Sequence, residues 1–285
     1  MQNDRVMLNI GCGRVFHEDW INLDVAPADA SVVQLDASKG LPFKDGTVDV
    51  CYSSHVLEHI AAHEAGLFLS ECARALKPGG VVRIVVPDLE MIVREYSLLL
   101  HKLNEGDDSR SDDYDWIMLE LFDQVEREKS GGEMAQYLLR PDLPNREFIR
   151  ARIGAEAESY WKPGMNEAAT VANVESIWRK LLAKSPSHVM KKLRERLAKS
   201  MVRLIAGESA ADAFQVGLFR ASGEIHRWMY DRYSLARLLK QAGFVDVVVC
   251  DAETSRISNF AHYGLDSVEG RIRKADSLFV EGIRS

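Results

Sequence analysis

Short apolar runs of strand length dominate the first third of the chain. They are rich in β-branched residues and most lack polar alternation, the pattern of strands that are buried on both faces of a parallel sheet. Between two of these runs, residues 61–76 carry apolar side chains at helical spacing, and the run Lys77-Pro78-Gly79-Gly80 ends that helix. This strand, helix, strand unit predicts a doubly wound α/β fold. The predicted strands are residues 6–10, 20–25, 32–35, 48–52 and 81–86.

The strand pattern is absent from residues 101–223, which instead resemble several helices separated by Gly and Pro breaks. A stretch of this length is too long for a plain connection, so we predict a helical insertion, or lid, after the fifth strand. From residue 224 the sheet pattern resumes, with a helix at 233–242 and strands at 244–250 and 277–283. We therefore expect one domain made of residues 1–100 and 224–285, interrupted by the helical lid.

Net charge, apolar runs and cysteine spacing exclude a few classes of protein. The net charge of −7 argues against broad nucleic-acid binding. The chain has no apolar run of about 18 residues and no N-terminal apolar leader, so we expect neither a membrane span nor secretion. Four cysteines, without any C-x-x-C pair, favour reduced thiols in a cytoplasmic protein.

One stretch is strongly basic. Residues 179–203 hold nine Lys or Arg and one acidic residue, with apolar residues near helical spacing. This pattern is typical of a solvated helix face in the lid. The alternative is peripheral contact with an anionic membrane or a polyanionic acceptor.

The most specific chemical signal is a glycine turn directly after the first predicted strand. Gly11 and Gly13 allow backbone N–H groups to approach a ligand at the carboxyl ends of the strands. Two carboxylates, Asp24 and Asp36, end the second and third predicted strands. A dinucleotide fingerprint requires a third glycine at the position of Phe16 and an acidic residue about 20 positions on. Asp24 follows Gly13 by only 11 positions, so S-adenosylmethionine (SAM), which has one nucleoside, fits better than NAD.

These motifs resemble the class I SAM-dependent methyltransferases, and most closely their bacterial type-11-like branch. The resemblance implies a Rossmann-like sheet of seven strands, the last antiparallel. It also implies SAM as cofactor and an acceptor-binding role for the lid. The matching runs are residues 8–13, 20–24, 41–43, 53–59, 76–80, 86–89, 226–231 and 242–244.

The resemblance also assigns roles by position. The glycine turn faces the methionine and ribose of SAM, Asp24 the ribose hydroxyls, and Asp36 the adenine. One departure is Asn9, where the wider superfamily usually has Asp or Glu; Arg14 is then a candidate for holding the cofactor's carboxylate. The candidate cofactor-binding residues are Asn9, Gly11, Cys12, Gly13, Arg14, Asp24, Asp36, Ala37, Ser53 and Ser54.

Methyl transfer to a hydroxyl needs a base, and histidine is the usual choice. His55 is the first candidate; His226 is the second, with Asp231 as the residue that could orient it. Related enzymes modify cell-surface glycans or secondary metabolites, which points to O-methylation of a sugar or a small hydroxylated acceptor. The alternative of a different class is a methyltransferase-like module that binds SAM or a partner without catalysis.

A zinc-hydrolase interpretation competes for part of the same motif. His55, Glu58 and His59 match H-x-x-E-H, in which two histidines bind zinc and the glutamate is the base. That motif requires a helix with both histidines on one face, whereas here a predicted strand leads into it and the glycine turn has no role. We therefore predict no metal site and expect Glu58 and His59 to cap and pack the following helix.

Overall fold

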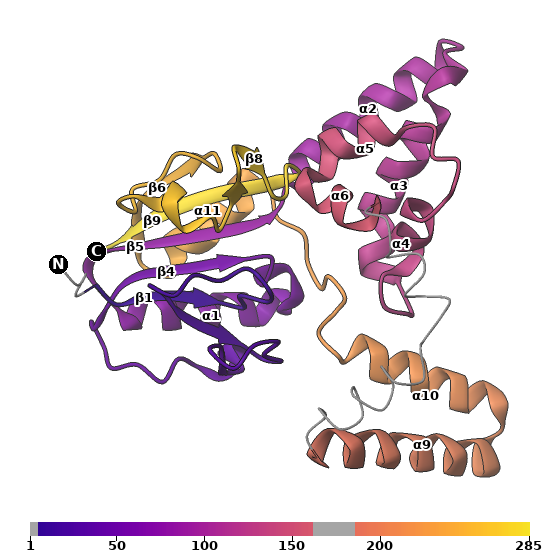
Figure 1. Ribbon diagram of the computed structural model, residues 1–285, viewed down its shortest axis with the longest axis horizontal. Helices are drawn as coiled ribbons and strands as arrows, with labels where there is room; N and C mark the ends of the chain where they lie inside the picture. Colours follow the sequence, from indigo (N-terminus) through magenta and orange to yellow (C-terminus); the bar gives the residue numbers. More distant parts are fainter. Residues whose placement is uncertain (1–4, 162–185) are drawn as a thin grey trace.

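The computed structural model describes residues 5–161 and 186–285. A seven-stranded sheet forms one part of the molecule, and most of the helices extend away from it (Figure 1). Two features of the sequence lie outside the described residues: one of the breaks between the predicted lid helices, at Pro163-Gly164, and residues 179–185 of the basic stretch. The sheet strands are β1 (Met7–Ile10), β2 (Ile21–Asp24), β3 (Val33–Gln34), β4 (Val48–Ser54), β5 (Leu76–Pro87), β6 (Phe244–Cys250) and β9 (Ser277–Arg284).

The strands are ordered β3-β2-β1-β4-β5-β9-β6. Neighbours from β3 to β5 are parallel, whereas β9 is antiparallel to both β5 and β6. This confirms the predicted Rossmann-like α/β fold with seven strands, of which the last is antiparallel. The first strand lies near the centre, so its carboxyl end faces the crevice where open α/β sheets bind ligands.

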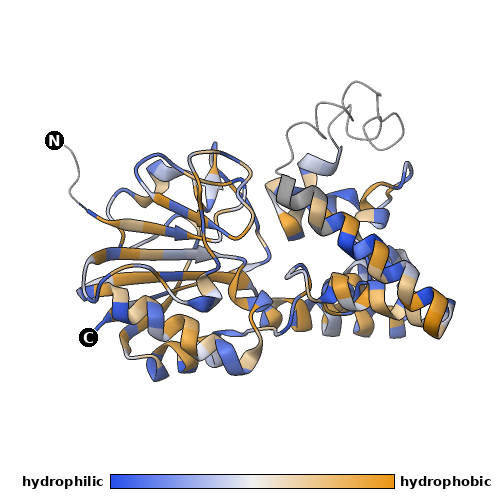
Figure 2. Ribbon diagram, turned by 90° about the horizontal axis from the view of Figure 1, so that it is seen from below, coloured by the Kyte–Doolittle hydropathy of each residue, from blue (hydrophilic) through white to orange (hydrophobic). Residues whose placement is uncertain are grey.

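Two helices cover one face of the sheet, α1 (Ala62–Ala75) and α11 (Arg232–Gln241). Their apolar sides pack Phe68, Leu69 and Leu235, all nearly inaccessible to solvent, against the strands. Each such side chain stabilises the fold by roughly 1.5–3 kcal/mol. Figure 2 shows apolar stretches in the strands and on the helices of this face, and others in the helices beyond the sheet.

The other face has a different cover. Aromatic residues from the segment after β6, including Phe260 and Tyr263, pack with Trp20 and Tyr52 on the strands. The helical element of this segment is the short 3-10 turn η4 (Phe260–Tyr263). The connection from β1 to β2, residues 11–20, is too short for a crossover helix, so irregular chain covers this face.

Five of the remaining helices, α2 to α6, form a separate hydrophobic cluster. Trp116 and Ile117 lie at its centre and pack with Ile92 and Leu99 of α2. A helical hairpin, α9 and α10, projects away from both parts (Figure 1). No helix among residues 5–161 and 186–285 is long and apolar enough to cross a membrane. The helices are α2 (Leu89–Asn104), α3 (Ser111–Glu126), α4 (Gly132–Leu138), α5 (Arg146–Ile153), α6 (Ala155–Trp161), α9 (Pro186–Ala206) and α10 (Glu208–Arg220), and the other short elements are η1 (Ala37–Lys39), η2 (Leu57–His59), η3 (Asp108–Arg110), β7 (Ser267–Val268) and β8 (Arg271–Ile272).

Candidate active site

The glycine turn lies at the carboxyl end of β1 and is tied to the end of β2. The N–H groups of Gly11 and Cys12 donate to the carbonyl of Leu23, and the N–H of Gly13 donates to Oδ2 of Asp24 at 2.8 Å. Both glycines have left-handed φ angles, +70° and +55°. A Cβ on Gly13 would meet no described atom within 4 Å, so this side of the turn is open to a ligand.

Two buried asparagines hold the short loop that follows this turn. Nδ2 of Asn9 donates to the carbonyl of Val15 and to Oδ1 of Asn22, both at 3.0 Å. Nδ2 of Asn22 donates to the carbonyls of His17 and Trp20. An acidic residue at position 9 would have no N–H for these bonds, so the departure from the superfamily has a local structural reason.

Asp24 is the last residue of β2 and Asp36 lies two residues after β3, and each carboxylate already has protein partners. Asp24 also accepts from the N–H of Ala26 at 2.8 Å. Asp36 caps the 3-10 turn that begins at Ala37 and pairs with Lys39 at 2.8 Å. Bonds from Lys39 and Ser38 hold the pKa of Asp36 below its usual value. Both carboxylates keep free lone pairs, because an ionised carboxylate has about four acceptor sites.

A cavity of about 880 Å³ lies over the carboxyl ends of β1 and β4. Its size is within the range of small-molecule and cofactor sites. The far wall is formed by α6 and by the segment that carries the β7–β8 hairpin. The predicted site residues that line it are Asn9, Gly11, Cys12, Gly13, Arg14, Ser54 and His55, whereas Asp24, Asp36, Ala37 and Ser53 do not.

Cys12 is a protonated thiol in this cavity. Burial, followed by the charge of Asp24, raises the pKa of Cys12 to about 11. Such a group packs as a small apolar side chain and is a poor nucleophile at neutral pH. Cys12 therefore shapes the cavity without contributing reactive chemistry.

His55 lines the cavity in a strained conformation, with φ +54°. Its Nε2 lies 2.9 Å from Oγ of Ser277 at the start of β9, and its Nδ1 lies 3.1 Å from Oε1 of Glu58. Glu58 is completely buried. This carboxylate, imidazole and hydroxyl in line are the geometry in which a histidine can take a proton on Nε2.

Glu58 remains ionised in spite of its burial. Burial alone raises the pKa of Glu58, but the contact with His55, and the charge of the three nearby histidines where they are protonated, lower it to about 2. His226, one of the three, is itself buried and neutral, since burial lowers its pKa to about 3. An anionic Glu58 holds the Nδ1–H of His55 and leaves Nε2 free to accept.

His226 lines a second, smaller cavity of about 270 Å³ between the sheet and the helices α3, α4, α5 and α6. His59 also lines it, with its ring centroid 4.9 Å from that of His226. His55, Glu156 and Lys274 line both cavities. The structure therefore brings the two candidate bases, His55 and His226, to neighbouring cavities with Glu58 between them.

Asp231 does not contact His226, contrary to what the sequence suggested. Its carboxylate accepts from the N–H of Ser234 at 2.7 Å and caps α11. That bond is the main reason why the pKa of Asp231 is lowered. Within the part of the chain that the structure describes, no hydrogen bond or ion pair joins Asp231 to His226.

A buried ion-pair network behind the site was missed from the sequence. Arg83 is fully buried and contacts Asp266 and Glu281, each at 2.8 Å. It also donates to the carbonyls of Asp251 and Thr254. The network anchors the segment that forms the far wall of the large cavity. A lone arginine inside an apolar strand was the available signal, because such a charge needs a buried partner.

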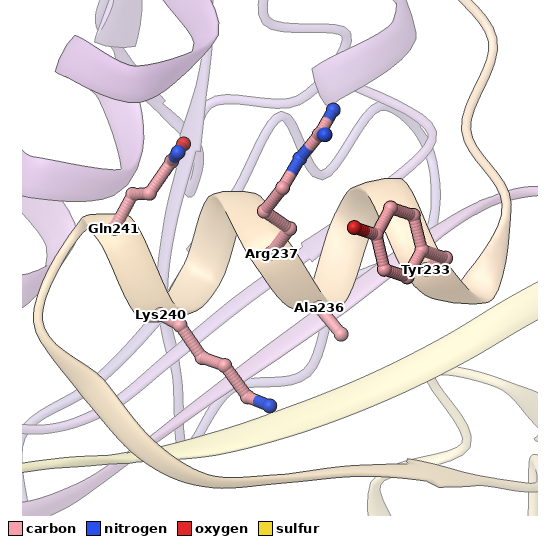
Figure 3. A pocket seen from close by; sticks show the side chains of 5 residues that line it. All are labelled: Tyr233, Ala236, Arg237, Lys240 and Gln241. Atoms are coloured by element: carbon pink, nitrogen blue, oxygen red, sulfur yellow. The ribbon is translucent and has the colours of Figure 1, made fainter.

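A third hollow, of about 390 Å³, lies on the surface of α11 (Figure 3). Every side chain lining it comes from this one helix, and Tyr233 is 71% exposed. No residue of the glycine turn lines this hollow, and neither do His55, His59 and His226. It therefore lacks the converging polar groups of a binding site.

Comparison with known proteins identifies the first part of the chain. A family model described as a methyltransferase domain matches residues 8–84. A probable S-adenosylmethionine-dependent methyltransferase from Mycolicibacterium smegmatis is 33% identical over 101 residues, which is 30% of this chain and 38% of that protein. The chain thus spans well under half the length of this relative.

Solved structures are similar at a lower level. A SAM-dependent methyltransferase from Archaeoglobus fulgidus is 24% identical, with a TM-score of 0.28, over 33% of this chain and 52% of that one. A Haemonchus contortus phosphoethanolamine N-methyltransferase is 14% identical, with a TM-score of 0.36, over 100% of this chain and 49% of that one. TM-scores this low do not support a shared function, so the assignment rests on the family match, the strand order and the glycine turn. Residues 8–84 thus match a methyltransferase domain, in agreement with the strand order of the sheet and with the glycine turn after β1.

Proposed function

We propose that the chain transfers a methyl group from SAM to a hydroxyl of a sugar, a glycan or another small acceptor. The observation that carries this proposal is the position of His55, which lines both the cavity at the glycine turn and the cavity beside the helices. A base at such a boundary can serve an acceptor on one side and a methyl donor on the other. We place this activity in the cytoplasm, where the four free cysteines would stay reduced.

At the cofactor end, the residues present fit SAM. The open side of Gly13 leaves space for a nucleoside, and Asp24 retains lone pairs for ribose hydroxyls. We assign Asp36 and the backbone of Ala37 to the adenine, Arg14 to the cofactor's carboxylate, and Ser53 and Ser54 to the reacting end. SAM supplies, when bound, a methyl group on a positively charged sulfur.

The chain's own contribution is alignment and proton transfer. Nε2 of His55 takes the proton of the acceptor hydroxyl. The oxygen of that hydroxyl bonds to the methyl carbon as the carbon–sulfur bond breaks. Glu58 stabilises the imidazolium that forms. The hydroxyl of Ser277, 2.9 Å from Nε2, marks the position that an acceptor hydroxyl would take.

We propose residues 101–223 as the part that selects the acceptor. Gln124, Arg127 and Tyr160 from this part line the smaller cavity, together with Asp276 and Lys274 from the sheet side. These groups offer hydrogen-bond donors and acceptors suited to a polyhydroxylated molecule.

The test is a His55→Gln variant compared with the exposed His63→Gln as control. We expect His55→Gln to bind SAM as the parent protein does in calorimetry. Its release of S-adenosylhomocysteine in the presence of sugar and glycan acceptors should fall about 100-fold or more, since a general base contributes about that factor. His63 lies on the surface of α1, 83% exposed, and its variant should keep full turnover.

Two results would count against the proposal. Unchanged turnover in His55→Gln would remove His55 as the base. SAM binding without turnover of any hydroxylated, amine or thiol acceptor would favour the alternative, a module that binds SAM without catalysis.

The basic helix α9 supports a further part of the proposal, peripheral contact with an anionic membrane. Apolar side chains at spacings of three and four residues are exposed along it, with Leu197 at 58% and Leu204 at 87%. Lys192, Arg194 and Arg196 are exposed on the same helix. An apolar stripe beside basic side chains is the pattern of helices that lie in the membrane interface.

Sedimentation with lipid vesicles tests this contact. Vesicles containing phosphatidylglycerol should bind the protein, whereas pure phosphatidylcholine vesicles should bind it weakly. Reversal of Lys192 and Arg196 to Glu should abolish the difference, and Lys240→Glu on α11 is the control. If neither vesicle binds and the reversal changes the oligomeric state instead, the helix faces a second copy of the chain and the membrane proposal is wrong.

A further inference from the structure

Two distant segments meet behind the smaller cavity. Glu58 and His59 belong to the 3-10 turn after β4, and His226 lies in the segment between α10 and α11. The carbonyl of Glu58 accepts from the N–H groups of Arg227 at 2.6 Å and Trp228 at 3.2 Å. These backbone bonds hold the histidine segment against the turn, so the three side chains are placed together by the fold.

The cluster contains polar atoms that have no hydrogen-bond partner among the described residues. Oε1 of Glu58 has one close polar neighbour, Nδ1 of His55 at 3.1 Å, whereas Oε2 of Glu58 and Nδ1 of His226 are buried without a hydrogen-bond partner among the described residues. Glu58 is 0% exposed and His226 is 3% exposed. Oε2 of Glu58 has no such neighbour among the described residues, and a buried carboxylate oxygen without a donor is costly unless it is paired or coordinates a metal.

The donor atoms converge. Glu58, His59 and His226 each offer one ligand atom, and these atoms lie within 4.8 Å of one another. Nδ1 of His59 lies 3.0 Å from the carbonyl of Ile225. A proton on that nitrogen leaves Nε2 as a free lone pair, which is the arrangement by which metal-binding histidines are oriented.

We propose that Glu58, His59 and His226 bind a divalent cation of the zinc type. Two imidazole nitrogens and one carboxylate oxygen are a donor set found in catalytic zinc sites, which keep a fourth position open. Donors in a tetrahedral zinc site lie about 3.4 Å apart. Side-chain rotations that move the donor atoms by about an ångström would bring these three to that spacing. The open position would face the smaller cavity, which both histidines line.

This set differs from the H-x-x-E-H zinc motif. In that motif His55 would be a ligand and Glu58 the base, whereas here the ring nitrogens of His55 contact Glu58 and Ser277. The turn is a 3-10 turn of three residues and does not present His55 and His59 on one helix face. If the proposed methyl transfer holds, the cation would bind the acceptor's oxygen and make its hydroxyl more acidic.

The test is zinc binding to chelator-treated, tag-free protein, measured by calorimetry, with the visible absorption of a cobalt(II) derivative as a second readout. We expect one equivalent of zinc. Glu58→Gln and His226→Ala should each weaken binding by about 100-fold or more and should lose the cobalt spectrum. Retained SAM binding and circular dichroism would show that these variants are folded.

The surface cluster of His17, Asp19 and His262 supplies the matched control, because its donor atoms also converge but are largely exposed. His262→Ala should leave the zinc affinity unchanged. The proposal is overturned if the parent protein takes up less than a tenth of an equivalent, or if binding survives both cluster variants.

The same experiment separates this inference from the proposed function. Zinc binding without methyl transfer to any acceptor would leave the site intact and remove the proposed function. Undiminished methyl transfer by a protein that binds no zinc would do the reverse.

Discussion

Gly11 and Gly13 have the same backbone hand but different surroundings. A Cβ on Gly11 would lie 2.2 Å from Cγ2 of Val56, whereas one on Gly13 would meet no described atom within 4 Å. Gly13→Ala should therefore cost only the left-handed strain, about 1–2 kcal/mol, yet weaken SAM binding about 10-fold or more, because the methyl group occupies ligand space. Gly11→Ala should destabilise the fold more. Urea unfolding and calorimetry with SAM measure both effects.

The decisive result is the difference in lost stability between Gly11→Ala and Gly13→Ala. Val56→Ala in the Gly11→Ala background should restore part of the lost stability, since it removes the atom in conflict. Equal losses of stability in the two single variants would show that the two sides of the turn are not different in solution.

At the scale of elements, α6 docks on the hairpin segment through Gly154. This residue has φ +63°, and a Cβ there would lie 2.6 Å from the carbonyl oxygen of Ile272. The N–H of Glu156 donates to the carbonyl of Arg273 at 3.1 Å. Gly154→Ala should thus cost about 2 kcal/mol or more, from strain and from separation of the two elements.

A glycine with the same backbone hand and free space gives the comparison. Gly106 has φ +91°, and a Cβ there would meet no described atom within 4 Å, so Gly106→Ala should cost about 1–2 kcal/mol. Limited proteolysis should cut the hairpin segment faster in Gly154→Ala only. Equal proteolysis of both variants would mean that α6 does not depend on this contact.

For the whole molecule, Arg83 connects the sheet to the wall of the large cavity. Arg83→Met would leave Asp266 and Glu281 buried without their cation, and we expect a loss of about 3–5 kcal/mol in the free energy of unfolding. Arg94, which is 72% exposed and pairs with Glu90, is the control; Arg94→Met should cost less than about 1 kcal/mol. Denaturant unfolding measures both, and similar losses would show that the buried network adds no stability.

Much of the fold was predictable from local patterns. The strand 244–250 was predicted with the observed ends, and α1 begins and ends within a residue or so of the predicted 61–76. These predictions hold because each element repeats its own pattern of burial along the chain. The pattern could not foresee that irregular chain, rather than helices, covers the second face, since this depends on how a ten-residue connection packs.

The sequence by itself determined which edge of the sheet carries the candidate site. The signals are a glycine turn and carboxylates near strand ends, and both are local. Only the tertiary structure decided which side chains meet there. Ser277 reaches His55 across 222 positions, and His226 joins Glu58 from another segment altogether. Such contacts follow from packing over the whole molecule, because no local propensity records which distant residue fills the space beside a given side chain.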